Sequence, residues 1–288
     1  MKPARYGPFP YSPIIDRPKL TWPGGARVAL WVIPNIEFFP LDEPIPPFGP
    51  ETVPDVSNWS TRDYGARIGV FRLMDVLGRH KLRGTVTLNS EVCEAYPPII
   101  EECMKLDWEI MGHNQSNSRV LMGIPPDEEQ ALIKDVFATI EKSTGKRPRG
   151  WLGSGLKETW HTLDYLLDEG CEYIADWVND DQPYRMDVNG RQMVSIPYST
   201  EINDLPAFYR YFRSADEFEQ MICRQFDTLY AEGEEQGRVM AICLHPFVIG
   251  MPHRISCLDR ALDYICGHEH VWLATGSEII DHYLSSVD

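Results

Sequence analysis

Short apolar runs alternate along this chain with segments of helical periodicity. Runs of about four to eight residues that are rich in β-branched side chains and bounded by turn residues indicate buried strands. Strands that are separated by helices pair in parallel through right-handed crossovers. This order predicts an α/β barrel with parallel strands. The predicted strands are Val28–Ile33, Gly84–Leu88, Trp108–Met111, Gly150–Leu152, the run before Asp180, Met193–Tyr198, Val239–Leu244 and Val271–Thr275.

The length and composition of the chain fit one domain of this class. The chain has 288 residues, of which 43% are hydrophobic, enough to bury a large core. Residues 1–27 are rich in proline and lack periodicity, so we expect this extension to wrap the outside of the fold. The barrel domain is then expected to span residues 28–288. The proline-rich stretch from Pro40 to Pro54 is expected to be a loop that shapes its mouth.

Polar side chains follow four of the apolar runs. They are Glu37, His113, the Asp180–Asp181 pair and His245. Because an α/β barrel gathers the C-terminal ends of its parallel strands into one mouth, residues that are distant in sequence can meet there. Two carboxylate segments and two histidines in one mouth predict a hydrolase.

Each of these residues also has a structural interpretation. Glu37 could be a salt-bridged loop carboxylate, although its place after a buried strand and before two phenylalanines favours proton exchange. His113 could be a core histidine with satisfied hydrogen bonds, and the aspartate pair could cap a helix or turn. His245 is the strongest candidate, because Pro246 ends the strand at the imidazole.

The charge of the chain argues against several classes of partner. The 43 acidic and 27 basic residues give a formal net charge of −16, and the basic residues are scattered, which argues against nucleic acid and an anionic membrane surface. The N-terminal residues lack the apolar segment of a secretory signal, and no run reaches the roughly 20 apolar residues of a membrane span, so we expect a cytoplasmic protein. The expected partners are a small-molecule substrate and further copies of the chain in a homo-oligomer.

Several local motifs are absent from the sequence. The seven cysteines form no Cys-x-x-Cys pair, which argues against a zinc knuckle and a disulfide framework. The sequence has no Gly-rich phosphate loop, no serine nucleophile elbow and no His-Glu-x-x-His zinc helix. Phosphoryl transfer and serine-type chemistry therefore have no local support.

The order of the sites resembles that of the polysaccharide deacetylase superfamily, whose fold is a deformed (β/α) barrel. The resemblance covers nearly the whole chain. The family's first motif, a pair of aspartates after the first strand, falls on Glu37 and Phe38, and its second, His-x-x-x-His, falls on His113 and Asn117. The other three motifs correspond to Arg149–Ser154, Asp180–Tyr184 and Cys243–His245.

Departures from these motifs indicate a particular branch of the superfamily. In the metal-dependent members the second aspartate and both histidines hold a divalent ion, and only His113 of those three is retained here. Because zinc normally takes three or four nitrogen, sulfur or oxygen ligands, the resemblance implies that no tightly bound metal is present. The chain resembles the branch of cofactor-independent allantoinases and bacterial cyclic imide hydrolases, on the segments Arg62–Arg67, Asp180–Tyr184, Ile196–Tyr198 and Asn203-Asp204.

The resemblance implies a hydrolase that acts on a carbon–nitrogen bond of a small cyclic amide, such as a cyclic imide, a hydantoin or an allantoin-like ureide. One alternative is a metal-dependent N-deacetylase of an amino sugar or of a peptidoglycan- or chitin-type saccharide, which would need a divalent ion such as zinc. A second alternative is a binding barrel without catalysis. Retention of both Glu37 and His245 argues against the binding barrel.

The proposed reaction gives each candidate residue a role. Glu37 occupies the family's base position and would activate water, and His245 would give a proton to the leaving nitrogen. In place of a metal, His113, Asn117 and backbone amides near Gly153 and Ser154 would donate hydrogen bonds to the oxyanion. The expected substrate contacts are completed by Asp180 or Asp181, as acceptors of the ring N–H, and by Trp151, as a stacking surface.

Overall fold

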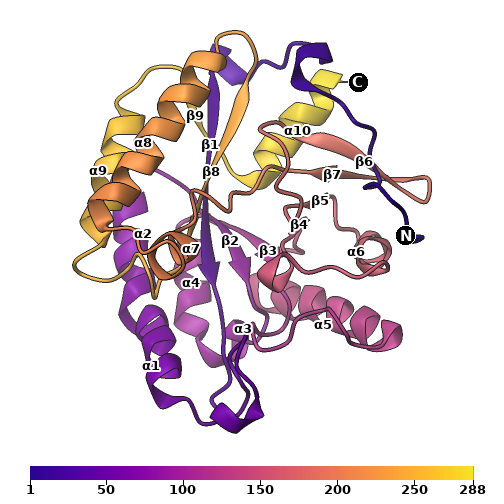
Figure 1. The fold of residues 1–288 in the computed structure, drawn as a ribbon, viewed down its shortest axis with the longest axis vertical. Helices are drawn as coiled ribbons and strands as arrows, with labels where there is room; N and C mark the ends of the chain where they lie inside the picture. The colour runs from indigo at the N-terminus through magenta and orange to yellow at the C-terminus, as the bar shows by residue number, and fades with distance from the viewer. Residues whose placement is uncertain (288) are drawn as a thin grey trace.

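The computed structural model describes residues 1–287 and shows one α/β domain. Within this range, nine strands form one sheet in the order β6-β7-β5-β4-β3-β2-β1-β8, with β9 paired to β1. The sheet curls into a half-barrel with helices around its outside (Figure 1). The predicted single-domain fold is therefore confirmed. The strands are β1 (Val28–Ile36), β2 (Thr85–Leu88), β3 (Glu109–Gly112), β4 (Gly150–Trp151), β5 (Tyr173–Ile174), β6 (Tyr184–Val188), β7 (Arg191–Ser195), β8 (Arg238–Leu244) and β9 (Val271–Leu273).

The long strand β1 lies at the centre of this sheet. All nine of its residues are buried, and it pairs in parallel with β2, β8 and β9. The predicted strand ends at Ile33, one residue before Pro34. The strand nevertheless continues to Ile36, since Asn35 and Ile36 change partner and pair with β2. This extension places Glu37 directly at the C-terminal end of the sheet.

One hairpin departs from the predicted parallel pairing. Strands β6 and β7 are antiparallel, and Asn189 and Gly190 between them have φ angles of 55° and 82°. Two central residues with positive φ form the type I′ turn that suits a two-residue hairpin, and Asn-Gly is the sequence that favours it. The sequence analysis does not predict strand β6, although the Asn-Gly pair carries the signal for this turn.

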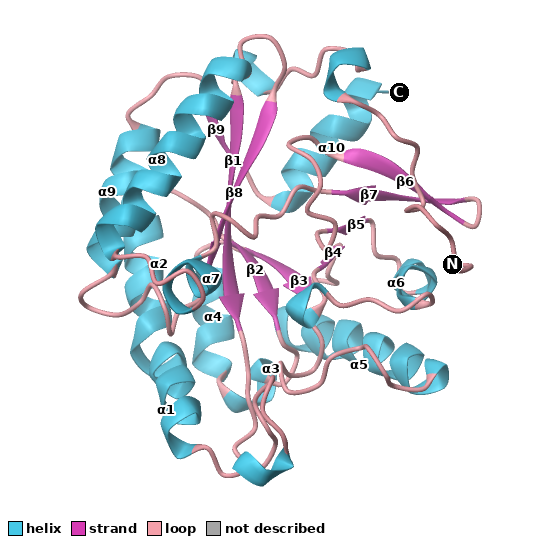
Figure 2. Ribbon diagram, viewed as in Figure 1, coloured by secondary structure: helices cyan, strands magenta, loops and turns pink. Residues whose placement is uncertain are grey.

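Helices cover the outer face of the sheet, as Figure 2 shows in cyan. Two of them have clear end signals: α5 begins at Pro126 and is followed by Gly145 in the left-handed conformation, and α8 carries the Ser214–Glu217 capping box. Within residues 1–287, no helix is long and apolar enough to cross a membrane. The helices are α1 (Val56–Tyr64), α2 (Val70–Arg79), α3 (Val92–Ala95), α4 (Pro97–Lys105), α5 (Pro126–Thr144), α6 (Thr162–Asp168), α7 (Asp204–Tyr209), α8 (Ala215–Glu232), α9 (Ile255–Cys266) and α10 (Gly276–Val287).

The segment between β7 and α7 lies along the free edge of β8. Asn203 forms a single parallel bridge with Cys243, and the Cys243 N–H donates to the Ile202 carbonyl at 3.0 Å. The hydroxyl of buried Tyr198 donates to Asn35 Oδ1 on β1 at 3.2 Å. This segment, residues 196–203, is called the seam segment below. It leads directly into α7 beside the C-terminal end of β8.

Candidate active site

Three predicted residues converge at the C-terminal ends of β1, β3 and β8. The Oε1 atom of Glu37 lies 3.5 Å from Nε2 of His245 and 3.7 Å from Nε2 of His113. The three side chains are only 6%, 5% and 3% exposed, respectively. The structure therefore brings together a carboxylate and two imidazoles from three strands, in surroundings that exclude most water.

Asp204 at the start of α7 holds the ring of His245. The Nδ1–H of His245 donates to Asp204 Oδ1 at 2.7 Å, and Asp204 Oδ2 accepts from the backbone N–H groups of His245 at 2.8 Å and Ile249 at 3.1 Å. These contacts direct Nε2 of His245 toward Glu37. Sequence reasoning did not assign Asp204 a role, because it stands one residue past the N-cap Asn203, where an acidic residue is an ordinary helix start.

The charges around His245 keep it protonated. Burial alone would lower its pKa, but the carboxylates of Glu37 and Asp204 outweigh burial and raise the pKa of His245 to about 10. Burial raises the pKa of Asp204, but its backbone donors and the imidazolium favour its ionised form, and we place the proton on His245. Burial would also raise the pKa of Glu37, whereas His245 and His113 hold it well below its usual range. Glu37 is thus ionised and His245 charged at neutral pH.

His113 is held by a neutral partner. Its Nδ1 lies 2.5 Å from the carbonyl oxygen of Leu152, and because a carbonyl oxygen only accepts, Nδ1 carries a proton. Its Nε2 is buried and makes no hydrogen bond within residues 1–287. The Nε2 atom therefore remains available for a hydrogen bond with water or substrate. The expectation that His113 donates a hydrogen bond to the oxyanion stays a prediction.

A carboxylate lies behind the peptide that holds His113. The Gly153 N–H belongs to the same peptide group as the Leu152 carbonyl, and it donates to Asp176 Oδ1 at 2.8 Å. Asp176 and Glu158 are close neighbours, and burial raises the pKa of both. The charge of Asp176 raises the pKa of Glu158 further, so Glu158 keeps the proton. Asp176 is therefore linked to His113 indirectly, through the Leu152–Gly153 peptide group that hydrogen-bonds to both side chains.

Asn117 and Phe38 lie beside this centre. The backbone N–H of Asn117 donates to the Phe38 carbonyl at 3.0 Å. Asn117 Oδ1 accepts from Ser154 Oγ at 2.6 Å and from Asn89 Nδ2 at 3.1 Å. Because this oxygen is engaged, the amide nitrogen is the group that Asn117 can offer to a substrate.

The side chains at positions 38 and 117 do not fit a bound metal. Phe38 has no donor atom, and the Asn117 oxygen is already occupied by hydrogen bonds. In the part of the chain that the structure describes, no group of three or more His, Cys, Asp or Glu side chains is arranged to hold an ion. No step of the reaction is therefore derived through a metal.

Trp151 does not reach the site. Its side chain is 0% exposed and stacks on Phe137 of α5, with ring centroids 6.0 Å apart and an interplanar angle of 7°. It packs beneath Gly112, where an added Cβ would lie 2.7 Å from the indole. Trp151 is therefore a core residue between the sheet and α5. The expectation that it stacks on a substrate ring was wrong, because the two-residue strand β4 directs this side chain outward.

Asp180 and Asp181 lie at the other end of the sheet. The Asp181 carbonyl accepts from the N–H of Val239 near the start of β8, at 2.8 Å, whereas His245 follows the end of the same strand. At about 3.3 Å per residue, the strand separates the two positions by roughly 20 Å. The expectation that this pair binds the substrate at the mouth was wrong. Strand β5 ends at Ile174, so Asp176 takes the place expected for Asp180.

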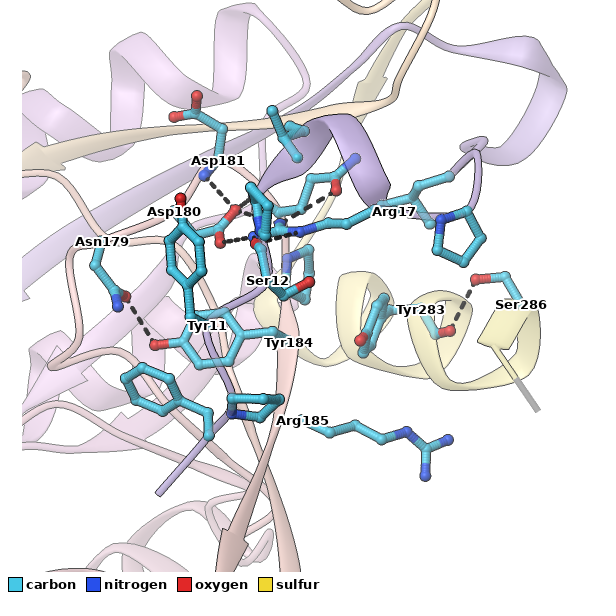
Figure 3. A pocket seen from close by; sticks show the side chains of 18 of the residues that line it. Tyr11, Ser12, Arg17, Asn179, Asp180, Asp181, Tyr184, Arg185, Tyr283 and Ser286 are labelled. Atoms are coloured by element: carbon cyan, nitrogen blue, oxygen red, sulfur yellow. Dashed lines mark hydrogen bonds and ion pairs between the residues drawn. The ribbon is translucent and has the colours of Figure 1, made fainter. Parts of the chain in front are cut away.

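Asp180 instead anchors the N-terminal extension. Its carboxylate accepts from Arg17 Nη1 at 2.7 Å and Nη2 at 2.5 Å, as Figure 3 shows. The Asp187 N–H donates to the Pro8 carbonyl at 2.7 Å, which ties the extension to β6 as well. A cavity of about 1100 Å³ lies between this extension, β6 and α10, and neither Glu37 nor His245 lines it.

Comparisons with known proteins address the fold and the superfamily. No model of a protein family matches the chain. A Schizosaccharomyces pombe protein named "Putative polysaccharide deacetylase" is 27% identical over 273 residues, an alignment that covers 89% of this chain and 85% of that protein. A crystal structure of a probable polysaccharide deacetylase from Pseudomonas aeruginosa has 27% sequence identity and a TM-score of 0.85, with 94% of this chain and 96% of that chain covered.

A crystal structure of Puue allantoinase is similar to the same extent. It has 26% sequence identity and a TM-score of 0.86, and the match covers 94% of this chain and 95% of that chain. Together the comparisons support the polysaccharide deacetylase superfamily, and they confirm the expected deformed barrel. They also support a hydrolase that acts on carbon–nitrogen bonds.

Proposed function

We propose that this hydrolase of the polysaccharide deacetylase superfamily opens the ring of a small cyclic amide with water and without a tightly bound metal. The main support for this proposal is that two features occur at one site. Phe38 and Asn117 stand where the family's metal-dependent members have ligands, while the Glu37–His245 pair is retained. The structural likeness to an allantoinase supports a cyclic ureide or a related imide or hydantoin as the substrate class.

The protonation states of the site suit this reaction. Ionised Glu37 takes a proton from water as the water oxygen bonds to the ring carbonyl carbon, and His113 Nε2 makes a further hydrogen bond at the reaction centre. The C–N bond then breaks, and charged His245 gives its proton to the departing nitrogen. The products are a carboxylate and an amide or ureide on one open chain. General acid–base help of this kind contributes on the order of 10²–10⁴-fold.

The substrate must compensate for the missing Lewis acid. A metal that polarises a carbonyl contributes several kcal/mol to an amide hydrolysis. An imide or hydantoin carbonyl is more electrophilic than the acetamide of an N-acetyl sugar, because two groups share the nitrogen lone pair. Cyclic imides and ureides are therefore the amides for which a carboxylate and an imidazolium suffice.

A second candidate is a metal-dependent N-deacetylase of an amino sugar or of a peptidoglycan- or chitin-type saccharide. The names of two similar proteins favour it, since both are called polysaccharide deacetylases. This function needs ligands that Phe38 does not provide. It therefore ranks below the cyclic amide hydrolase.

One assay separates the two candidates. Purified protein is given cyclic imides, hydantoins, allantoin-like ureides and N-acetylglucosamine oligomers, before and after exhaustive chelation, and its metal content is measured. We expect turnover of a cyclic amide that survives chelation and is abolished in Glu37→Gln. Deacetylation of the oligomers that depends on a stoichiometric metal would overturn the proposal.

A further inference from the structure

An arginine from α1 lies among the aromatic rings next to the catalytic pair. The guanidinium carbon of Arg62 is 4.5 Å from the ring centroid of Phe39 and 5.0 Å from that of Phe247. Phe39 follows Glu37 by two residues, and the ring of Phe247 meets the imidazole of His245 edge-on at 5.7 Å. The two rings that hold the cation therefore flank the base and the acid.

The helix that carries Arg62 is fixed against the site. The Trp59 indole N–H donates to the Phe39 carbonyl at 2.8 Å. A π-helical turn, Gly65–Gly69, joins α1 to α2, and a Cβ at Gly65 would lie 2.6 Å from the backbone nitrogen of Phe247. Only glycine allows this close approach. The helix therefore cannot shift along the loop after His245, and the guanidinium is held in a defined place.

One edge of the guanidinium is available. Nη1 donates to the backbone and side-chain oxygens of Asn58, whereas Nε is buried and makes no hydrogen bond within residues 1–287. A buried donor without a partner is costly, and cation–π contacts do not replace the missing hydrogen bond. The Nε–Nη2 edge of arginine is a planar fork that matches two oxygens on one carbon. The edge is thus shaped for a carboxylate or for an equivalent pair of oxygens.

We propose that the Nε–Nη2 edge of Arg62 binds the two oxygens on the reacting carbon and stabilises the oxyanion. This inference rests on the proposed hydrolysis. Attack by water gives the carbon two geminal oxygens at nearly the spacing of a carboxylate, whereas the ground state has one. Both N–H groups of the fork therefore find an oxygen only after water begins to attack. Interactions that are stronger in the transition state than in the ground state lower the activation barrier. The ring-opened product keeps both oxygens as its carboxylate.

Electrostatics support this role for Arg62. The reaction places negative charge on the carbonyl oxygen, and Phe38 replaces the family's metal ligand nearby. Behind His113 lies a carbonyl group and no carboxylate. Burial lowers the pKa of Arg62 and the charge of Glu37 offsets only part of this, but a guanidinium remains charged in proteins at neutral pH. It supplies at this mouth the positive charge that a metal supplies elsewhere in the family.

Kinetics of Arg62 variants test the proposal. Arg62→Gln should lower kcat by roughly 10²–10³-fold with KM changed only a few-fold, as for loss of one oxyanion donor. Arg62→Lys should recover little, because an ammonium lacks the fork. Guanidinium ion added to Arg62→Ala should restore part of kcat. Arg67→Gln is the matched control, since Arg67 is 72% exposed on the same helical segment and pairs with Asp63.

Two further measurements separate the possible failures. A kcat within threefold of wild type in either folded Arg62→Gln or folded Arg62→Lys would overturn the role of Arg62 and leave the proposed function standing. If no amide is turned over by the wild-type protein, the proposed function fails. Calorimetry with the ring-opened monoamide of succinate then decides the oxygen-binding role, for which we expect at least tenfold weaker binding in Arg62→Gln and no change in Arg67→Gln. Equal binding would overturn it.

Discussion

His245 and His113 present the same atom to Glu37 but are held by different partners. Their Nε2 atoms lie 3.5 Å and 3.7 Å from the same carboxylate oxygen. Behind His245 the Nδ1–H meets the carboxylate of Asp204, whereas behind His113 it meets the Leu152 carbonyl. A full negative charge stabilises an imidazolium, while a carbonyl fixes the tautomer and adds only a dipole. Of two similar histidines, only His245 has a carboxylate behind it that stabilises its charged form.

The largest expected effect comes from removing the charge behind His245. Asp204→Asn should lower kcat by roughly 10²–10⁴-fold. The amide favours the wrong tautomer of His245, and it no longer stabilises the charged imidazole that carries a proton on Nε2. Activity needs charged His245 and is lost as the pH rises through its pKa. The alkaline limb of the kcat profile should therefore move to lower pH in the variant. Asp168→Asn, an exposed carboxylate paired with Arg191, is the control. An unshifted alkaline limb would contradict the role of Asp204.

The same charges should make stability depend on pH. His245 has a folded pKa of about 10, compared with about 6.5 in an unfolded chain, so its contribution is full below about pH 6.5 and is lost as the pH rises toward 10. The depressed pKa of Glu37 adds stability that is lost in acid. The free energy of unfolding, measured in urea, should fall between pH 7 and 10. In Asp204→Asn the fall should begin at lower pH, and identical curves would show that the two charges are not coupled.

A smaller effect is expected behind His113. Asp176→Asn should lower kcat about tenfold, because the carboxylate acts on the imidazole through the Leu152–Gly153 peptide and not directly. Glu158→Gln, which keeps a neutral polar side chain beside Asp176, should cost less. The comparison is measured as kcat at one pH, with circular dichroism as the check on folding. A loss in Asp176→Asn as large as that in Asp204→Asn would remove the distinction between the two histidines.

The smallest effect on catalysis is expected at the opposite end of the sheet. Arg17→Ala should leave kcat within twofold, although the Arg17–Asp180 pair is as well aligned as the contact between His245 and Asp204. Loss of this partly buried ion pair should lower the free energy of unfolding by about 1–3 kcal/mol. Urea denaturation together with the cyclic amide assay checks both numbers. A tenfold loss of kcat would mean that the N-terminal extension influences the mouth.

The parts of the site that sequence analysis located lie on long strands. Glu37 and His245 follow β1 and β8, whose long continuous buried runs make the strands easy to locate, although β1 extends three residues beyond the predicted end at Ile33. The run from Tyr173 to Asn179 resembles such a strand, but pairing stops after two residues, and this misplaced Asp180. Asp204 reaches His245 because the seam segment is bridged to β8. That bridge joins residues that are distant in sequence, so the local sequence does not predict the contact.

The seam segment is joined to β8 by a single bridge, and this join also positions Asp204 against His245. Proton transfer by His245 therefore depends on the seam segment staying attached to β8. One bridged pair and one adjacent hydrogen bond join this segment to Cys243, and Asp204 is the next residue after Asn203. Contacts this sparse open at lower free energy than a fully paired strand. On warming, the carboxylate would leave His245 while β1 to β5 are still assembled. Heat inactivation should therefore precede the loss of secondary structure, so that enzyme activity reports a local opening that spectroscopy of the whole chain does not detect.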